Sequence, residues 1–304
     1  MSRDLLTLKE LSGKEINDII DFGIKIKKNP EKYSTSLKDK SLAMIFQKTS
    51  TRTRISFEVG MTQLGGHAVY LDWRTTQFVM ADIKDEAKVV SRYTDCIMAR
   101  VLKHADLLEM AKGSEVPVIN GLCEKYHPCQ TLADLMTIKE HKGKLNGLKL
   151  AYFGIGNNVS NTLSLGCIRT GMRFTLCVPE MDPLSIDNEL LDELKVSGLY
   201  DEEKDPKKAI KRADIVYTDT WVNMEVFLDP KFEEEKKRRI KLLMPYQINK
   251  KLLEGSDALV MHDLPAHRGY EIDDYAITCP KSIIFDQAEN RLHSQKAALL
   301  TLIK

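Results

Sequence analysis

SLAMIFQKTSTRTRISFE, residues 41–58, sets the pattern of the fold. The five apolar residues at 42–46 predict a buried strand. The hydroxyl and arginine residues that follow stand where the chain turns into a helix. A strand that leads directly into a helix is the unit from which parallel α/β sheets are built, so this stretch predicts an α/β protein.

Short apolar runs and longer amphipathic segments alternate along the rest of the chain, which predicts two parallel-sheet βα domains with a cleft between them. The polar, glycine-containing residues 140–147 (EHKGKLNG) mark the domain boundary. The segment Gln287–Lys304 is expected to be a helix. The expected strands are Ser41–Phe46, His67–Leu71, Cys96–Ala99 and Val116–Ile119 in the first domain, and Leu148–Phe153, Phe174–Val178, Ile215–Thr218, Ala258–Met261 and Ile283–Phe285 in the second.

Clusters of polar residues follow the carboxyl ends of the expected strands. In open α/β sheets, ligands bind outside these strand ends. The convergence of several such clusters therefore predicts an enzyme with one shared site. The clusters are KTSTRTR (48–54), ARVLKH (99–104), KYHPCQ (125–130), GIGNNV (154–159), TDTW (218–221) and HDLP (262–265).

The first cluster stands at a predicted helix start, with Ser50, Thr51 and Thr53 interleaved with Arg52 and Arg54. The unpaired N–H groups and partial positive charge of a helix start favour a phosphate, and a guanidinium adds a planar charged fork. A Ser/Thr helix cap followed by a solvated basic turn explains the same residues equally well. The spacing does not match GxxxxGK[ST], so an ATP site is disfavoured.

Two further clusters carry weaker signals. His127 and Gln130 lead into a helix and could donate to a carbonyl oxygen and an amide, although a histidine packed at a helix start is the better explanation if the motif stood alone. The GIG of residues 154–156 begins a dinucleotide fingerprint, but Val159 replaces the third glycine, which disfavours a nicotinamide site. The adjacent Asn157 and Asn158 suit an amino-acid head group better.

Acidic residues gather on the other side of the expected site. Asp219, Asp263 and Glu225 would form a pocket for an ammonium-bearing substrate, although an Asp at a strand end is by itself more often a helix cap. His127 and Cys129 have no second pair at ligand spacing, so no metal site is expected.

Composition restricts the class of protein. The net charge of +1, with 43% hydrophobic and 29% charged residues, gives no charge excess for nucleic acid or a membrane surface. No apolar run is long enough to span a bilayer, and the N-terminus lacks the apolar segment of a signal peptide. The six cysteines are far apart, as in buried thiols of a reducing compartment. We expect a cytoplasmic protein with small-molecule partners.

Together these motifs resemble the aspartate/ornithine carbamoyltransferase family over essentially the whole chain. FQKTSTRTRISFE (46–58) looks like the family's carbamoyl-phosphate signature, and MARV, YHPCQ, NNV, DTW and DQAENR stand in the order of its ornithine branch. The resemblance implies transfer of the carbamoyl group of carbamoyl phosphate to the side-chain amine of L-ornithine, giving citrulline and phosphate, without a cofactor. It also implies a carbamoyl-phosphate-binding domain of residues 1–139 plus 288–304 and an acceptor-binding domain of residues 140–287.

The resemblance also implies the roles of individual residues. Those implied to bind carbamoyl phosphate are Ser50, Thr51, Arg52, Thr53, Gln77, Arg100, His127, Gln130, Leu264 and Arg291. Those implied to bind the acceptor are Asn158, Asp219, Asn223, Met224, Asp263 and Leu264. The expected catalytic residues are Arg52, Thr53, Arg100, His127 and Asp263. The family's trimer implies a homotrimer or a multiple of trimers, in which Gln77, from the loop Trp73–Asp82, completes a neighbouring subunit's site.

Three departures from the ornithine pattern fall on the acceptor side. Asn223-Met224-Glu225 stands where the family has Ser-Met-Gly, Asp263 stands where it has cysteine, and the segment after Met224 is longer. An aspartate beside the reacting amine would hold its ammonium form, raise its pKa and slow the attack. Two alternatives therefore remain: a carbamoyltransferase for putrescine or a related amine, and a non-catalytic relative that binds carbamoyl phosphate. The segment after Arg291 is short for the extra C-terminal helix of putrescine enzymes.

Overall fold

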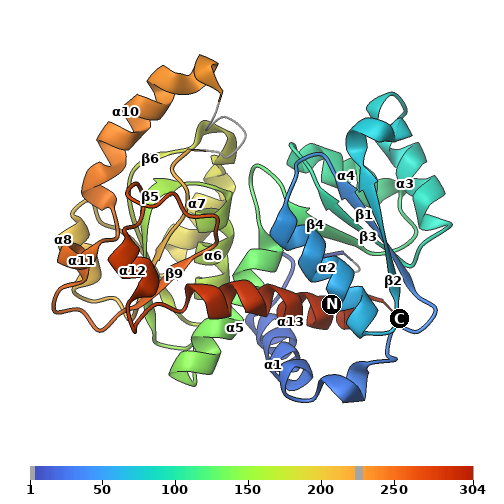
Figure 1. The fold of residues 1–304 in the computed structure, drawn as a ribbon, viewed down its shortest axis with the longest axis horizontal. Coiled ribbons are helices and arrows are strands. Elements are labelled where there is room, and N and C mark those ends of the chain that lie inside the picture. Colours follow the sequence, from blue (N-terminus) through green and yellow to red (C-terminus); the bar gives the residue numbers. More distant parts are fainter. Residues whose placement is uncertain (1–3, 223–228, 304) are drawn as a thin grey trace. The chain divides into compact units, whose positions relative to one another are not determined.

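The computed structural model describes residues 4–222 and 229–303 and divides the chain into two compact units. The first unit consists of Met1–Gly143 and Glu289–Lys304, and the second of Lys144–Ala288. Each unit contains one sheet whose neighbouring strands are parallel, with helices between the strands in sequence (Figure 1). The predicted α/β class is confirmed.

The first unit is built on a sheet in the order β2-β1-β3-β4. The central strands β1 and β3 are almost completely buried, as their apolar runs predict. Helices α3 and α4 lie side by side, and α1 packs against α5 (Figure 1). The strands are β1 (Ser41–Phe46), β2 (His67–Asp72), β3 (Cys96–Arg100) and β4 (Val118–Leu122). The helices are α1 (Gly13–Lys28), α2 (Thr51–Gln63), α3 (Ile83–Ser91), α4 (His104–Gly113) and α5 (Pro128–Lys142), with short 3-10 turns η1 (Pro30–Tyr33), η2 (Trp73–Thr75) and η3 (Gln77–Val79).

Local sequence explains where the helices of this unit begin and end. A capping box starts α1, because the Ser12 hydroxyl accepts from the Glu15 N–H at 3.2 Å and the Glu15 carboxylate accepts from the Ser12 N–H at 2.9 Å. Proline 128 occupies the first turn of α5, where its missing N–H costs nothing. That helix is buried through Ile138 and ends at Gly143, whose φ of +75° suits glycine. The second unit begins at the next residue, Lys144.

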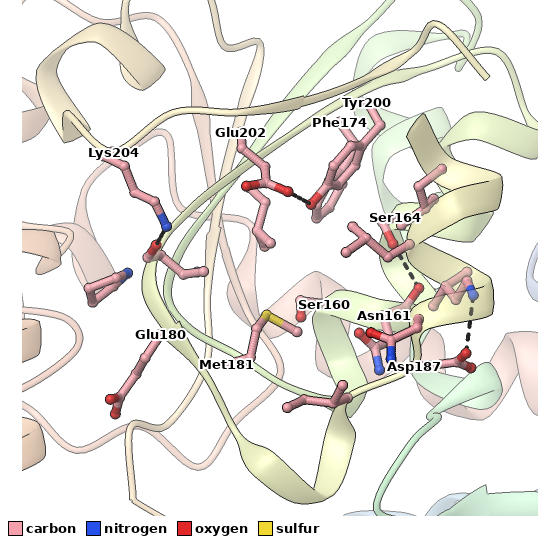
Figure 2. Close-up of a pocket in the computed structure, with 18 residues that line it drawn as sticks. Ser160, Asn161, Ser164, Phe174, Glu180, Met181, Asp187, Tyr200, Glu202 and Lys204 are labelled. Carbon is pink, nitrogen blue, oxygen red and sulfur yellow. Dashed lines mark hydrogen bonds between the residues drawn. The ribbon is translucent and has the colours of Figure 1, made fainter. Parts of the chain in front are cut away.

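The second unit is built on a sheet in the order β7-β6-β5-β8-β9. Helices α6 and α7 lie on one side of β5 and β6, and α8, α11 and α12 gather on the other (Figure 1). Next to α6 and α7, the sheet borders a cavity (Figure 2). The strands are β5 (Lys149–Gly156), β6 (Arg173–Met181), β7 (Tyr200–Glu202), β8 (Ile215–Thr218) and β9 (Leu259–His262). The helices are α6 (Asn158–Arg169), α7 (Asn188–Val196), α8 (Pro206–Ile210), α10 (Glu233–Leu243), α11 (Lys250–Leu253) and α12 (Asp274–Thr278), with 3-10 turns η4 (Pro183–Ser185), η5 (Pro230–Phe232) and η6 (Met244–Tyr246). The last helix, α13 (Ile284–Leu302), begins in the second unit and belongs to the first from Glu289 onward.

One expected strand, Ile283–Phe285, is wrong. Ser282 forms a single isolated bridge to Val260, and α13 begins at Ile284. Ile283 and Ile284 are buried while Phe285 is 64% exposed, so the apolar run is the start of a helix with one face covered. A run of three apolar residues cannot by itself distinguish a strand from a buried helix start. Across the described residues, 4–222 and 229–303, no helix combines the length and apolar character needed to cross a bilayer.

The end of β5 requires glycine at position 154. The pairing of β5 with β6 shifts register between Phe153 and Ile155, and Gly154 has a φ of +113°. A Cβ atom added to Gly154 would lie 2.7 Å from Nε1 of the buried Trp221. Both the backbone conformation and the close approach therefore exclude a side chain here.

We expect Gly154→Ala to lower the free energy of unfolding by about 3 kcal/mol, because it adds a steric clash to an unfavourable φ. Gly198→Ala is the matched control: Gly198 has a φ of +68°, but its added Cβ would meet no atom within 4 Å. The free energy of unfolding of Gly198→Ala should fall by only about 1 kcal/mol, because only the positive φ is unfavourable there. Denaturant unfolding of both variants measures the difference, and equal losses would contradict the close contact with Trp221.

Candidate functional site

The first cluster of hydroxyl residues caps helix α2. The Ser50 Oγ accepts a hydrogen bond from the Thr53 N–H at 3.2 Å and donates to the Thr53 Oγ1 at 3.1 Å. Ser50 thus performs the cap that the sequence allowed as an alternative to a phosphate site. A cap satisfies one of the four N–H groups at a helix start, so it does not remove the attraction of the start for an anion. Thr51 is exposed beside it, and Arg52 is partly exposed.

A buried guanidinium connects this helix start to two other helices. Arg291, in α13, donates from Nη1 to the Gln130 Oε1 at 2.6 Å and from Nη2 to the Thr53 Oγ1 at 3.2 Å. Gln130 in turn donates from Nε2 to the buried Asp134 at 2.8 Å. Arg291 is only 4% exposed. Residues far apart in the sequence therefore form one hydrogen-bonded set within the first unit, which we call the Arg291 network (Thr53, Gln130, Asp134 and Arg291).

His127 lies within the same cationic environment. It immediately precedes α5 and is buried. Burial, followed by the positive charges of Arg291, Arg100 and Arg52, holds its pKa well below the ordinary value. The imidazole is therefore neutral at pH 7. Three guanidinium groups and a neutral hydrogen-bonding ring form a set that suits a small anion with a carbonyl group.

Two residues of this region were not predicted from the sequence. Gln47 joins the ends of β1 and β3, because its N–H donates to the Arg100 carbonyl at 2.8 Å and its Oε1 accepts from the Leu102 N–H at 2.7 Å. The other is Asp134, which holds the amide of Gln130. The sequence contained a feature that marks each of these residues. Gln47 directly follows the apolar run of a strand, and Asp134 is a charged residue within the apolar face of α5.

In the second unit, Asn157 organises the cluster at the end of β5. Its Oδ1 accepts from the N–H groups of Val159 at 3.0 Å and Ser160 at 3.1 Å, which caps α6. Its Nδ2 donates to the Asp219 Oδ2 at 2.6 Å. The other Asp219 oxygen accepts from the Thr220 N–H at 2.6 Å. Asn157, which the sequence did not single out for the acceptor, is thus bonded to Asp219, and the role of the adjacent Asn158 in acceptor binding stays a prediction.

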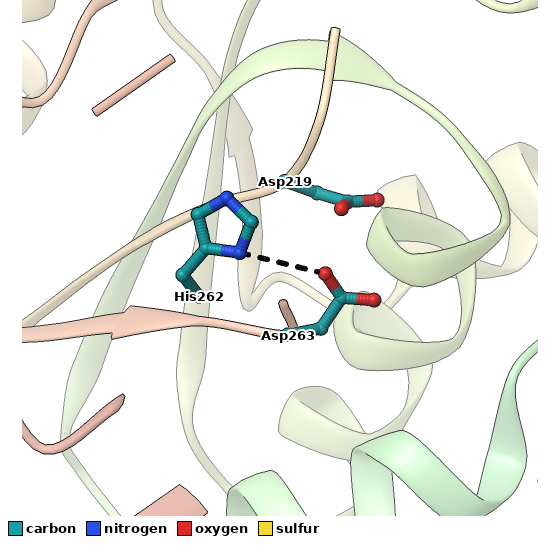
Figure 3. Close-up of side chains that lie close together, drawn as sticks. All are labelled: Asp219, His262 and Asp263. Atoms are coloured by element: carbon teal, nitrogen blue, oxygen red, sulfur yellow. Dashed lines mark ion pairs between the residues drawn. The ribbon is translucent and has the colours of Figure 1, made fainter. Parts of the chain in front are cut away.

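Asp219, His262 and Asp263 lie close together (Figure 3), with one possible ligand atom of each within 4.8 Å of the others. The His262 Nδ1 accepts from the Leu264 N–H at 2.8 Å and lies 3.6 Å from the Asp263 Oδ1. Its Nε2 lies 3.1 Å from the fully buried Glu271 carboxylate, which places the ring proton on Nε2. Both ring nitrogens are thus engaged, so the two aspartates suit an ammonium group better than a metal ion.

Leu264 completes the turn after β9 in an unusual backbone conformation. Its φ of +61° lies in the left-handed region, which branched residues rarely adopt. The hydrogen bond from its N–H to His262 helps to hold it there. Non-glycine residues kept in such conformations are concentrated at ligand sites.

The expected site residues divide between the units. Those of the first unit are Ser50, Thr51, Arg52, Thr53, Gln77, Arg100, His127, Gln130 and Arg291. Asn158, Asp219, Asp263 and Leu264 belong to the second unit, although Leu264 was also expected to bind the donor. Gln77 is exposed on η3, outside the Arg291 network. Asn223, Met224 and Glu225 lie outside the described residues.

Comparison with known proteins identifies relatives of both units. Residues 3–140 match the family model for the aspartate/ornithine carbamoyltransferase carbamoyl-P binding domain. Residues 146–302 match the model for the Asp/Orn binding domain of the same family. Each match covers most of one compact unit.

Individual relatives match over nearly their full length. The ornithine carbamoyltransferase of Archaeoglobus fulgidus is 46% identical over 99% of this chain and 97% of its own. That of Methanocaldococcus jannaschii is 47% identical over 96% of each chain. The solved structure of ornithine carbamoyltransferase from Pyrococcus furiosus has a TM-score of 0.91 and 44% identity, over 99% of this chain and 97% of its own.

The low pKa of His127 predicts how stability depends on pH. Below about pH 6.5 the unfolded chain binds a proton that the folded chain does not, so this residue makes stability fall as the pH decreases. In His127→Asn the slope of unfolding free energy against pH, between about pH 6.5 and 5, should be smaller by up to about 1.4 kcal/mol per unit. His267 and His293, whose pKa values burial also lowers, remain in both chains and cancel. Identical slopes in the two proteins would argue against a neutral His127.

Proposed function

This chain belongs to the aspartate/ornithine carbamoyltransferase family, and we propose that it transfers the carbamoyl group of carbamoyl phosphate to the side-chain amine of L-ornithine, giving citrulline and phosphate. The observation that carries the proposal is the Arg291 network, because it brings a buried cation to the start of α2 and to Gln130. Such a set of donors fits a small phosphorylated carbonyl compound.

The first unit supplies the donor site in this proposal. Ser50, Thr51, Arg52 and Thr53 hold the phosphate at the start of α2, where the helix dipole favours an anion. Arg100, His127, Gln130 and Arg291 hold the carbamoyl group. This assignment is supported by the low pKa of His127, which results first from burial and then from the positive charges of Arg291, Arg100 and Arg52.

The reaction follows from the charges. The neutral amine attacks the carbamoyl carbon, and negative charge develops on the carbonyl oxygen. N–H and O–H groups of Arg100, His127 and Thr53 stabilise that oxyanion, which is usually the largest contribution in acyl-type transfer. Phosphate then leaves with the bonding electrons, stabilised by Arg52 and the start of α2, and the amine loses its proton. Orientation of the two substrates supplies much of the remaining rate acceleration.

The second unit supplies the acceptor site. In this proposal Asn158 and Leu264 contact the amino acid, and the carboxylates of Asp219 and Asp263 hold its side-chain nitrogen. The family resemblance assigns acceptor binding also to Asn223 and Met224, which lie outside the described residues. Support comes from the closeness of the two carboxylates around His262. The negative charge of Asp263 stabilises the ammonium form of the acceptor and raises the pKa of its amine. The amine must therefore lose a proton against this attraction before it attacks.

We further propose a cytoplasmic homotrimer, or a multiple of trimers. Helix α2 and strand β2, which pack together, expose apolar side chains at Ile55, Val59 and Val69, and Val79 and Met80 are exposed near Gln77. Exposed apolar surface of this kind favours a subunit contact. Gln77 would then reach the donor site of a neighbouring subunit. The six cysteines are all buried thiols, which is consistent with a reducing compartment.

The function is tested by mixing carbamoyl phosphate with ornithine, putrescine, lysine, diaminobutyrate or aspartate, and measuring phosphate and ureido product. We expect ornithine to give the highest kcat/KM. Higher activity with putrescine than with ornithine would show that the acceptor is a diamine. If carbamoyl phosphate raises the Tm but no amine is turned over, the protein is a non-catalytic relative.

Arg291→Met links that activity to the proposed site. Loss of this cation should lower kcat/KM for carbamoyl phosphate by about a hundredfold or more. Arg92→Met is the matched control, because Arg92 lies on the surface and pairs with Glu115. Similar activities in the two variants would count against the Arg291 network as the donor site.

Asp263 should set the pH at which the bound amine becomes reactive. Asp263→Asn removes the charge at constant size, and Asp263→Cys introduces the side chain of the ornithine pattern. In both, the midpoint of the kcat–pH profile for ornithine should move about one unit lower, because the ammonium form loses a stabilising carboxylate. Turnover with ornithine at neutral pH should rise accordingly. A fall in turnover without a shift of the midpoint would mean that Asp263 is needed for another step.

A further inference from the structure

The second unit contains a cavity of about 320 Å³ that lies apart from the proposed acceptor residues. It is partly open and is lined mainly by residues of α6, β6, α7 and β7 (Figure 2). Protein interiors contain few voids larger than a water molecule, whereas small-molecule pockets begin at about 300 Å³. The size therefore indicates a place for a ligand. Asn158, Asp219 and Asp263 are not among the residues that line it.

The interior of the cavity is mainly apolar. The rings of Phe174 and Tyr200 lie nearly parallel, with centroids 6.2 Å apart, and form one wall (Figure 2). Leu176 of β6 and two residues of α7, Leu190 and Leu194, supply aliphatic surface. A charged side chain packed against these apolar groups would lose its hydration. The interior thus favours an aromatic or large aliphatic group and disfavours the side chain of ornithine.

Charged groups of both signs stand at one side of this apolar interior. The Lys204 Nζ donates to the Val178 carbonyl at 2.7 Å, which uses one of the three donors of an ammonium group. The Glu202 carboxylate accepts from the Tyr200 hydroxyl at 3.2 Å and has further lone pairs to offer. Glu202 ends the edge strand β7 and Lys204 follows it; both are exposed and line the cavity (Figure 2).

We propose that this cavity is a second binding site, for an α-amino acid with a large apolar side chain. Lys204 receives the carboxylate, Glu202 receives the ammonium group, and the side chain lies between Tyr200 and Leu194. A ligand with only one of the two charges would leave one of these groups without its partner.

A short series of hydrogen bonds connects the cavity to Asp219 of the proposed acceptor site. Ser160, which lines the cavity, accepts from the Asn157 N–H at 2.8 Å. Asn157 donates to Asp219 at 2.6 Å. A ligand in contact with Ser160 is therefore connected to the carboxylate of Asp219 through one intervening residue, Asn157.

Calorimetric titration of the full chain with three related compounds tests the proposal. L-Phenylalanine carries both charges, 2-phenylethylamine lacks the carboxylate, and 3-phenylpropanoate lacks the ammonium group. L-Phenylalanine should bind at least roughly tenfold more tightly than either analogue. No binding of L-phenylalanine, or equal binding of an analogue, would overturn the proposal. The readout is binding and does not depend on carbamoyl transfer.

Variants locate the bound ligand. Lys204→Met removes the cation and should weaken the binding of L-phenylalanine roughly tenfold or more. Lys207→Met makes the same change of charge at an exposed position that does not line the cavity, and should leave the affinity for L-phenylalanine unchanged. Ser164→Leu places extra volume inside the cavity and should also abolish binding while the melting temperature confirms folding. Unchanged affinity in Lys204→Met would place the ligand elsewhere, whatever the behaviour of Ser164→Leu.

Discussion

The buried guanidinium of Arg291 is the constraint on which the first unit depends. Removing a charge from water costs several kcal/mol unless hydrogen bonds replace the lost hydration. The oxygens of Gln130 and Thr53 do so, and they come from α5 and α2. Loss of either oxygen would leave the cation buried without a full replacement for its hydration, so the guanidinium holds α2 and α5 next to α13. The same charge also acts strongly on its neighbours, because screening is weak in the interior.

His127 and Asp219 illustrate how the two units use charge in opposite ways. In the first unit, burial and the nearby arginines lower the pKa of His127, so the neutral imidazole can donate a hydrogen bond without adding to the repulsion among the cations. In the second, Asn157 and a backbone N–H steady Asp219 next to Asp263. Each sheet positions these side chains at the carboxyl ends of its strands, which is the general place for ligands in parallel α/β folds.

The sequence predicted most of the strands, the α/β class and the turn from β1 into α2, because those depend on local apolar runs and on a Ser/Thr cap. It failed at Ile283–Phe285, where burial of one helix face imitates a strand. It also missed β7, whose residues Tyr200–Glu202 contain no apolar run. Pairings such as Asn157 with Asp219, or His262 with Glu271, depend on tertiary structure and leave no trace in local spacing.

Asparagine is difficult to replace at position 157. Its amide oxygen caps α6 while its amide nitrogen donates to Asp219, so one side chain must be an acceptor and a donor in opposite directions. Aspartate would keep the cap but bring a second negative charge against Asp219, and serine would cap but is too short to reach it. The choice of amino acid is thus less constrained at Asp263, in the loop after β9, than at Asn157. Substitutions that change the acceptor are therefore expected at position 263 before position 157.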